Sequence, residues 1–203
     1  MIILGSSTAN GWGASSHRRS WAGLLASHLD SLCSGKTVTS FTVNGYTTWQ
    51  FVPKEISRPQ GRPAIDPKVS LDQVLARQPS LVILQLNSND PAMGFLPAET
   101  IANHRLFLDS LRAHGIDAIE IGPFPRSLPK GNVSKIRALK DSLTRLVSPE
   151  KRVELWDSLA RDSVSVQPRF SAGDAVHLND EGHALIYRQL ARMLDWASLC
   201  PEP

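Results

Sequence analysis

Four short polar clusters contain the side chains whose types and spacing could perform acyl transfer. Each combines a possible nucleophile, base or hydrogen-bond donor with turn-forming neighbours. In chain order they are residues 5–8 (Gly-Ser-Ser-Thr), 44–46 (Asn-Gly-Tyr), 87–90 (Asn-Ser-Asn-Asp) and 174–177 (Asp-Ala-Val-His). Their content indicates catalysis by a hydroxyl nucleophile.

A nucleophile, a base and an orienting group are all present in these clusters. Acyl transfer requires a hydroxyl, a base that takes its proton and a third group that holds the base. Ser6 or Ser7 can supply the hydroxyl, and His177 can act as the base. Asp174 precedes His177 by three residues on an expected turn, which brings its carboxylate within reach of the imidazole.

The oxyanion that develops during acyl transfer also needs hydrogen-bond donors. The backbone N–H groups of Ser7 and Gly45 are candidates, since glycine lets the main chain approach a ligand closely. The side-chain amide of Asn89 is a third candidate. The sequence therefore predicts an oxyanion hole formed by Ser7, Gly45 and Asn89.

Each cluster also has an ordinary structural explanation. Gly-Ser-Ser and Asn-Gly are common in turns, and Asn89 and Asp90 can cap a following segment. An Asp-x-x-His pair arises by chance in many chains of ordinary composition. The functional interpretation therefore depends on all four clusters occurring together, each after an expected strand or before the last expected helix.

The elements that would position these clusters alternate between strands and helices. Short apolar or β-branched runs predict strands at residues 2–4, 37–43, 81–86, 118–121 and 152–156. Helical spacing of apolar residues predicts helices at 18–32, 70–78, 97–114, 133–147 and 179–199, the last with Asn179 as its N-cap. Proline-rich segments at 53–67 and 122–131 are expected to be loops.

This alternation predicts an α/β fold in which helices cover both faces of a parallel sheet. The chain of 203 residues favours a single domain, residues 1–203. Ligands of such sheets bind beyond the carboxyl ends of the strands. Three of the four polar clusters follow predicted strands, so this edge is the expected site.

Composition and charge argue against several other classes of protein. Hydrophobic residues make up 41% and charged residues 20%, as in ordinary globular domains. The net charge is +3, but the basic residues are scattered, so we expect no nucleic-acid partner. No apolar stretch approaches the roughly 20 residues of a membrane span. No signal peptide is visible, which favours a cytoplasmic protein, with a mature secreted form as the alternative.

The two cysteines, Cys33 and Cys200, fit no zinc motif. The sequence allows either a disulfide between them or two free thiols. No metal or organic cofactor is implied by the four polar clusters.

The order of the clusters resembles that of the SGNH/GDSL hydrolases, and the resemblance extends from residue 4 to residue 183. The first block of that family usually reads Gly-Asp-Ser-Leu and matches residues 5–8, which makes Ser7 the expected nucleophile. The glycine of the second block matches Gly45. The Gly-x-Asn-Asp and Asp-x-x-His blocks match residues 87–90 and 174–177. The resemblance implies a flavodoxin-like, three-layer α/β/α fold with a central five-stranded parallel sheet.

Two positions differ from the pattern of the family. Ser6 replaces the usual Asp beside the nucleophile. That Asp is not a member of the triad, so we expect activity to survive with altered local hydrogen bonding. Asn87 replaces the usual Gly of the third block, and Asn tolerates a positive φ better than most residues. The Asn87 side chain is expected to narrow or polarise the substrate pocket.

Aromatic residues near the clusters are candidates for the lining of that pocket. Trp12, Trp49 and Phe95 each follow one of the clusters, and ligand sites are usually apolar. Packing in the core is the alternative for all three. His183, inside the last predicted helix, is expected to have a structural role.

Taken together, the sequence predicts hydrolysis of small or soluble carboxylic esters through an acyl-enzyme intermediate. A carbohydrate O-deacetylase of the same family is the nearest alternative. A non-catalytic ligand-binding module on the same sheet is an alternative of another class. Residues 5–13, however, match neither the P-loop nor the dinucleotide-binding fingerprint. The sequence does not determine the oligomeric state.

Overall fold

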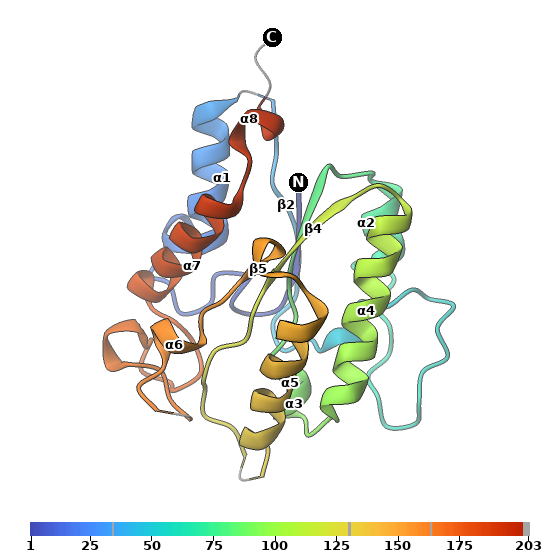
Figure 1. The fold of residues 1–203 in the computed structure, drawn as a ribbon, viewed down its shortest axis with the longest axis vertical. Coiled ribbons are helices and arrows are strands. Elements are labelled where there is room, and N and C mark those ends of the chain that lie inside the picture. The colour runs from blue at the N-terminus through green and yellow to red at the C-terminus, as the bar shows by residue number, and fades with distance from the viewer. Residues whose placement is uncertain (34, 130, 163, 201–203) are drawn as a thin grey trace.

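Five parallel strands form the centre of the structure, and helices cover both faces of this sheet (Figure 1). The computed structural model describes residues 1–33, 35–129, 131–162 and 164–200. The strands, in the spatial order β2–β1–β3–β4–β5, are β1 (Ile2–Gly5), β2 (Thr39–Thr42), β3 (Leu81–Gln85), β4 (Asp117–Ile121) and β5 (Arg152–Val153). The predicted α/β class and five-stranded parallel sheet are confirmed.

Helices of very different length connect the strands and follow the last one. The α-helices are α1 (Trp21–Leu32), α2 (Leu71–Ala76), α3 (Asn89–Ala92), α4 (Pro97–Ala113), α5 (Val133–Leu146), α6 (Trp156–Leu159), α7 (Asp180–Met193) and α8 (Trp196–Leu199). Short 3-10 helices are η1 (His17–Arg19), η2 (Thr48–Gln50), η3 (Pro149–Lys151) and η4 (Pro168–Phe170). Helices α1 and α7 lie on one side of the sheet, and α2 and α4 lie on the other (Figure 1).

The central strands are buried on both faces, which explains their continuous apolar sequences. In β1, the side chain of Ile3 packs with Trp21 and Leu25 of α1 in one hydrophobic core. Its neighbours Ile2 and Leu4 point to the opposite face, because successive side chains of a strand alternate. There they join a second core that includes residues of α2 and α4. Burial of each such side chain contributes about 1.5–3 kcal/mol, so both cores hold β1 at the centre of the sheet.

Polar side chains define where α1 and α7 begin. The Ser20 hydroxyl accepts a hydrogen bond from the N–H of Gly23 in the first turn of α1. The Asn179 side chain accepts one from the N–H of Gly182 in α7, so the predicted N-cap at Asn179 is confirmed. The cap at Asn179 therefore starts α7 just beyond the last polar cluster, whereas a loop and η1 separate the first cluster from α1.

The predicted helix over residues 179–199 is wrong in its last part. Helix α7 ends at Met193, Leu194 has an extended backbone, and a separate helix α8 begins at Trp196. The Asp195 carboxylate caps α8 by accepting hydrogen bonds from the N–H and the hydroxyl of Ser198. Because Leu194 is also buried in the core beside α1, local capping and packing outweigh the helical periodicity.

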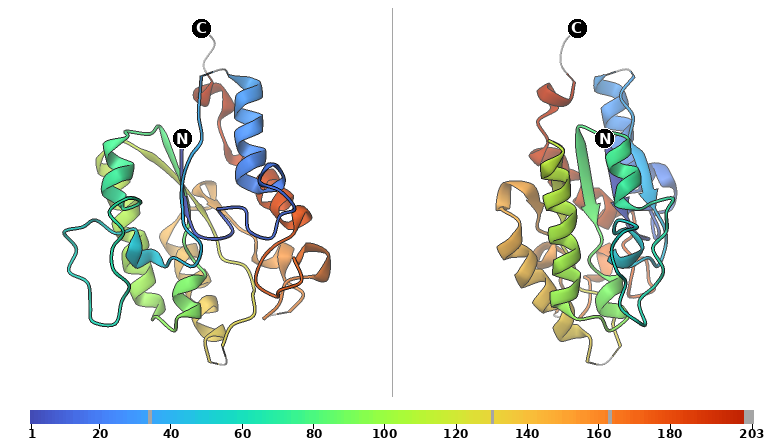
Figure 2. Two further views of the ribbon diagram at one scale, coloured as in Figure 1. Left: turned by 180° about the vertical axis from the view of Figure 1, so that it is seen from behind. Right: turned by 90° about the vertical axis from the view of Figure 1, so that its right-hand side faces the viewer.

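The bounds of other predicted elements also differ from the structure. The strand predicted at 152–156 ends at Val153, and the carboxylate of Glu154 accepts hydrogen bonds from the N–H groups of Leu155 and Trp156 as α6 begins. The helix predicted at 18–32 is divided at Ser20 into η1 and α1. The segment 53–67 contains no helix or strand, as expected, and projects from the body of the molecule (Figure 2).

A disulfide joins Cys33, at the end of α1, to Cys200, at the end of α8. Of the two alternatives that the sequence allowed, the structure therefore has the disulfide. Among the described helices, none combines the length and the hydropathy needed to cross a bilayer.

Candidate active site

Ser7, His177 and Asp174 form a continuous chain of hydrogen bonds. The Oγ atom of Ser7 lies 2.9 Å from Nε2 of His177. The Nδ1 atom of His177 lies 2.6 Å from Oδ2 of Asp174. Of the two candidate hydroxyls, the structure brings Ser7, and not Ser6, to the imidazole. The nucleophile–base–orienter geometry required for acyl transfer is therefore present.

The charge of Asp174 determines which nitrogen of His177 carries the proton. Burial acts to raise the pKa of Asp174, but hydrogen bonds from the His177 ring and from the N–H groups of His177 and Val176 lower it to about 2. The ionised carboxylate can only accept hydrogen bonds, so Nδ1 of the neutral imidazole must donate. This leaves the lone pair of Nε2 facing the Ser7 hydroxyl.

Two loops that are distant in sequence are fastened together so that serine and histidine meet. Residues 6–15 form a series of turns and bends between β1 and η1, and Ser7 lies near the start of this loop. Gly13 in these turns packs against the backbone of Leu178, which leaves no room for a Cβ atom. The N–H and the hydroxyl of Ser15 both donate to the Asp180 carboxylate at 2.7 Å. These contacts fix the Ser7 loop to the segment that carries His177.

The buried imidazole of His183 also holds the loop that carries Ser7. Its Nε2 lies 3.1 Å from the carbonyl oxygen of Trp12, and its Nδ1 lies 3.4 Å from the backbone nitrogen of Trp21. Burial lowers the pKa of His183, and the neutral ring satisfies both groups by donating from Nε2 and accepting at Nδ1. These contacts agree with the structural role that the sequence suggested for His183.

The N–H groups of Ser7 and Gly45 are available to a ligand. Neither donates a hydrogen bond to any part of the chain that the structure describes. Gly45 has a φ of 80°, a left-handed conformation that glycine adopts without strain. The Asn10 side chain links the two loops, since it donates to the Asn44 side chain at 2.9 Å and accepts from the Thr42 hydroxyl at 3.1 Å.

The side-chain amide of Asn89 is held in one orientation. Its Nδ2 donates to the carbonyl oxygen of Tyr46 at 2.8 Å, and its Oδ1 accepts from Nη1 of Arg126 at 3.2 Å. If the Asn89 amide were rotated by half a turn, its oxygen would face the Tyr46 carbonyl oxygen and its NH₂ group would face the N–H of Arg126. The two hydrogen bonds therefore determine which atom of the amide is Oδ1 and which is Nδ2. One hydrogen of Nδ2 remains for a ligand.

A buried polar cluster supports the start of α3, where Asn89 lies. The Asp90 carboxylate accepts hydrogen bonds from the N–H and the hydroxyl of Thr48 in η2. Next to it, the His104 imidazole lies between Oε2 of Glu120, at 3.1 Å from Nδ1, and the carbonyl oxygen of Leu86, at 3.2 Å from Nε2. The backbone before and within α3 is therefore tied to η2, α4 and β4.

A cavity of about 300 Å³ contains the reactive groups. The Trp12 ring, 55% exposed, forms part of its wall and lies 6.0 Å from the His177 ring, centroid to centroid. The lining residues are Ser7, Trp12, Asn44, Gly45, Asn89, Arg126 and His177. The predicted donors Ser7, Gly45 and Asn89 therefore line one cavity with His177.

Two residues predicted to bind substrate, Asn87 and Trp49, do not line this cavity. Asn87 is buried, and its side-chain amide donates to the carbonyl oxygen of Ile121 at the end of β4. Trp49 is buried in the core beside α4 and donates from its indole N–H to Glu99. Phe95 belongs to the same core. The Asn87 amide and the Trp49 indole N–H both donate to partners away from the cavity. The prediction that these two residues bind substrate is therefore corrected to a structural role.

Arg126 lines the cavity but was not among the predicted site residues. It lies in the proline-rich loop after β4, where its Nη1 donates to the Ser88 hydroxyl at 3.0 Å as well as to Asn89. Ligands bind beyond the carboxyl ends of parallel strands. Applied to the loop after β4, this rule would have identified Arg126 as a candidate.

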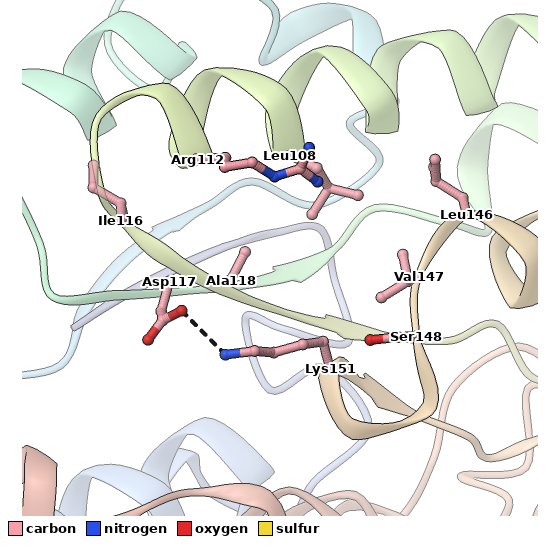
Figure 3. A pocket seen from close by; sticks show the side chains of 9 residues that line it. All are labelled: Leu108, Arg112, Ile116, Asp117, Ala118, Leu146, Val147, Ser148 and Lys151. Carbon is pink, nitrogen blue, oxygen red and sulfur yellow. Dashed lines mark hydrogen bonds and ion pairs between the residues drawn. The ribbon is translucent and has the colours of Figure 1, made fainter.

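A second cavity, of about 320 Å³, lies at the opposite end of β4 (Figure 3). It contains an ion pair between Lys151 and Asp117, with 3.0 Å between Nζ and Oδ1. Ser148 lines it, but none of its lining residues is a histidine that could act as a base. The chemistry therefore belongs to the cavity at Ser7.

The fold and the site together define a class: an α/β/α protein with a hydrogen-bonded Ser–His–Asp chain in the loops at the carboxyl edge of its sheet. The chain belongs to the GDSL-like lipase/acylhydrolase family, whose profile matches residues 3–185. The SGNH/GDSL resemblance is thereby confirmed, and the family is one of ester hydrolases.

Solved structures share this fold. A protein described as lipolytic, of the G-D-S-L family, from Desulfitobacterium hafniense has a TM-score of 0.71 and 14% identity, covering 95% of this chain and 98% of that chain. The esterase EstA from Pseudoalteromonas sp., solved as inhibited by monoethylphosphonate, has a TM-score of 0.65 and 17% identity, with coverages of 95% and 94%. A two-domain esterase active on acetylated mannans has a TM-score of 0.61 and 15% identity, covering 100% of this chain and 49% of that chain.

Sequence identities this low show the common fold and nothing finer. No curated protein matches the chain significantly.

Proposed function

We propose that the protein hydrolyses carboxylic esters of small or soluble substrates through an acyl-enzyme, with Ser7 as nucleophile. The observation that carries this proposal is the 2.9 Å approach of the Ser7 hydroxyl to Nε2 of His177, whose Nδ1 is held by Asp174. A hydroxyl that meets the free lone pair of an oriented imidazole can lose its proton as it attacks a carbonyl carbon.

In the proposed reaction, Ser7 Oγ bonds to the ester carbon while its proton passes to Nε2 of His177. The tetrahedral intermediate collapses, the C–O bond to the alcohol breaks, and His177 returns the proton to the departing alkoxide. Water then attacks the acyl-enzyme with His177 again as base, which releases the carboxylic acid and restores Ser7. Asp174 holds the Nδ1–H tautomer and stabilises the imidazolium formed in each half of the reaction.

The charge on the carbonyl oxygen is stabilised by N–H hydrogens that form no hydrogen bond with the described residues. We assign this role to the N–H groups of Ser7 and Gly45 and to one hydrogen of Asn89 Nδ2. Donors fixed before the reaction stabilise the transition state without reorganisation, and loss of one commonly costs 10²–10³-fold in rate.

Hydrolysis of acetyl groups from a carbohydrate is the second candidate. The cavity of about 300 Å³ is small, which favours short acyl groups, and one protein of the same fold is active on acetylated mannans. A panel of esters that varies the acyl group and the alcohol separately, with acetylated sugars included, distinguishes this candidate from a general small-ester hydrolase.

The decisive variant is Ser7→Ala, assayed with a short-chain p-nitrophenyl ester. We expect kcat/KM to fall by at least about 10³-fold. The matched control is Ser6→Ala, which removes the neighbouring buried hydroxyl, and it should remain within a few-fold of wild type. Labelling of wild type, but not of Ser7→Ala, by a fluorophosphonate probe separates an enzyme from a binding module. Near-wild-type turnover by Ser7→Ala would remove Ser7 from the mechanism.

For the cellular location, the sequence prediction was the cytoplasm, with a mature secreted form as the alternative. Disulfides persist mainly in oxidising compartments. The Cys33–Cys200 disulfide therefore supports the alternative, and we propose that the protein functions in an oxidising compartment.

A further inference from the structure

Arg126 is a cation in the cavity without an ionic partner. None of its nitrogen atoms lies within 4.0 Å of a carboxylate in the described chain. By contrast, Arg62 in the loop before α2 forms a two-pronged pair with Glu99. The negative charge of Asp174 acts on Arg126 through space, but the Asp174 carboxylate is already hydrogen-bonded to His177.

Most hydrogen-bond donors of the Arg126 guanidinium are unused. A guanidinium offers five N–H donors in a planar fork. Nη1 serves both the Ser88 hydroxyl and Asn89 Oδ1. Nε is buried and has no acceptor in the described residues. Both side-chain hydrogen bonds of Arg126 to those residues come from Nη1, so Nη2 is unused as well. The guanidinium is therefore held through Nη1, while Nε and Nη2 have no acceptor in the described residues.

The environment makes this unpaired charge unfavourable in the absence of a ligand. Burial lowers the pKa of Arg126, and the charge of Asp174 opposes that effect. A desolvated cation is stabilised when an anion with matching geometry enters beside it. Among the lining residues of the cavity, none is acidic. A negatively charged ligand group would therefore meet a cation and no repelling carboxylate in the wall.

The backbone holds Arg126 in place. The N–H of the next residue, Ser127, donates to the carbonyl oxygen of Ala175 at 2.8 Å, inside the turn between Asp174 and His177. Pro123 and Pro125 precede Arg126 and restrict the loop. The guanidinium is thus positioned relative to His177 and Asn89 before any ligand arrives.

We propose that Arg126 is an anion subsite, and that the preferred substrates are esters carrying a carboxylate or similar anionic group close to the scissile bond. This inference rests on the proposed ester hydrolysis at Ser7. The guanidinium binds the anionic group, and Ser7 and His177 act on the ester. Arg126 is thereby a specificity-determining residue.

Matched pairs of esters test the subsite. The first pair is 3-acetoxybenzoate and 3-acetoxybenzamide, which differ in charge on the alcohol side. The second is monomethyl glutarate and methyl glutaramate, which differ in charge on the acyl side. We expect wild type to favour the acid over the amide by at least about tenfold in at least one pair, mainly through a lower KM. The pair that shows the preference identifies which side of the ester faces Arg126.

The variant Arg126→Gln should lower kcat/KM for the acid of that pair by about 10–100-fold more than for the amide, whose own loss measures the effect of removing the hydrogen bond from Arg126 to Asn89. Arg126→Lys, which keeps the charge without the fork, should retain part of the preference. Arg188→Gln, on the exposed face of α7, changes the net charge equally and should leave the preference intact.

Three results would overturn the proposal or separate it from the function on which it rests. Equal turnover of acid and amide by wild type in both pairs overturns the anion subsite, whether or not the variants fold. An equal loss for acid and amide in Arg126→Gln also overturns it, since Arg126 would then act only by holding Asn89. Undiminished hydrolysis of these esters by Ser7→Ala contradicts the proposed function itself, and not the subsite alone.

Discussion

Gly13 lies against the backbone of Leu178 so closely that a Cβ atom would overlap the carbonyl oxygen of Leu178 and lie 2.9 Å from Cβ of His177. The first residue belongs to the turns that follow β1, and the second lies just before α7. The contact therefore sets the distance between the loop of Ser7 and the loop of His177. It requires a residue without a side chain, and the φ of 93° at Gly13 adds to that requirement.

The variant Gly13→Ala should push the two loops apart and disrupt the approach of Ser7 to His177. A displacement of about 1 Å at a reacting group can cost 10²-fold, so we expect kcat/KM for p-nitrophenyl acetate to fall by about 100-fold or more. Gly61→Ala is the matched control, because Gly61 has a φ of 79° with open space around it. Comparable activity in the two variants would show that the close contact does not set the site.

Asn89 and Asn87 are two residues apart, yet their amides have different partners, and their variants should differ accordingly. Asn89→Ala removes a proposed oxyanion donor, so kcat for p-nitrophenyl acetate should fall by about 10²–10³-fold. Asn87→Ala leaves the carbonyl oxygen of Ile121 without its donor. That variant should lose about 1–3 kcal/mol in the free energy of unfolding, measured in urea, and retain kcat. A kcat of Asn89→Ala within about threefold of wild type would exclude Asn89 from the oxyanion hole.

The sequence predicts the sheet and the catalytic residues Ser7, His177 and Asp174 because each of these features leaves a local signal in the chain. Short apolar runs separated by amphipathic helices suffice for a parallel sheet, and the edge where its strands end then collects Ser7, Asn89 and His177. An Asp three residues before His177 needs only a turn to reach the imidazole.

Features that depend on tertiary contacts were not predictable in this way. The direction of a side chain just after a strand depends on backbone dihedral angles that a short motif does not determine, so Asn87 was assigned to the pocket although it binds β4. Arg126 belongs to no recognised block, and its place beside Asn89 follows from the path of the loop after β4. The break at Leu194 arises because a buried leucine and the cap at Asp195 outweigh an uninterrupted helical pattern.

The buried pair of His104 and Glu120 should make stability depend on pH. Burial acts to lower the pKa of His104, but the charge and hydrogen bond of Glu120, with the charge of Asp90 and the bond to the Leu86 carbonyl, raise it above 6.5. The folded state then holds a proton that the unfolded chain releases at lower pH. The resulting stabilisation is complete below about pH 6.5 and is lost as the pH rises through the pKa of the folded state.

The free energy of unfolding, from urea titrations between pH 6 and 9, should therefore decrease with rising pH, by at most about 1.4 kcal/mol per pH unit for one proton. His104→Gln should flatten this dependence. Burial also raises the pKa of Asp90, against hydrogen bonds from Thr48 and Thr100, and this shift has the same sign, so some slope can remain. His114→Gln, at the exposed end of the same helix, is the control. An identical pH slope in wild type and His104→Gln would contradict the assignment.

The Cys33–Cys200 disulfide should stabilise the fold without contributing to the chemistry. It closes a loop with a sequence separation of 167 residues, and in the chain-entropy account a loop of this size contributes about 5 kcal/mol by restricting the unfolded chain. The bond joins the ends of α1 and α8, at the end of the molecule away from the loops that follow the strands (Figure 1).

The double variant Cys33→Ser/Cys200→Ser should therefore lose roughly 10 °C in Tm while its kcat at 25 °C remains close to that of wild type. Wild type treated with a reductant should have the same Tm as the double variant. By intact-mass measurement, untreated wild type should be lighter than reduced wild type by the mass of two hydrogen atoms. A Tm unchanged by reduction, together with a mass that shows two thiols before treatment, would mean that the two sulfurs are not bonded in the protein as purified.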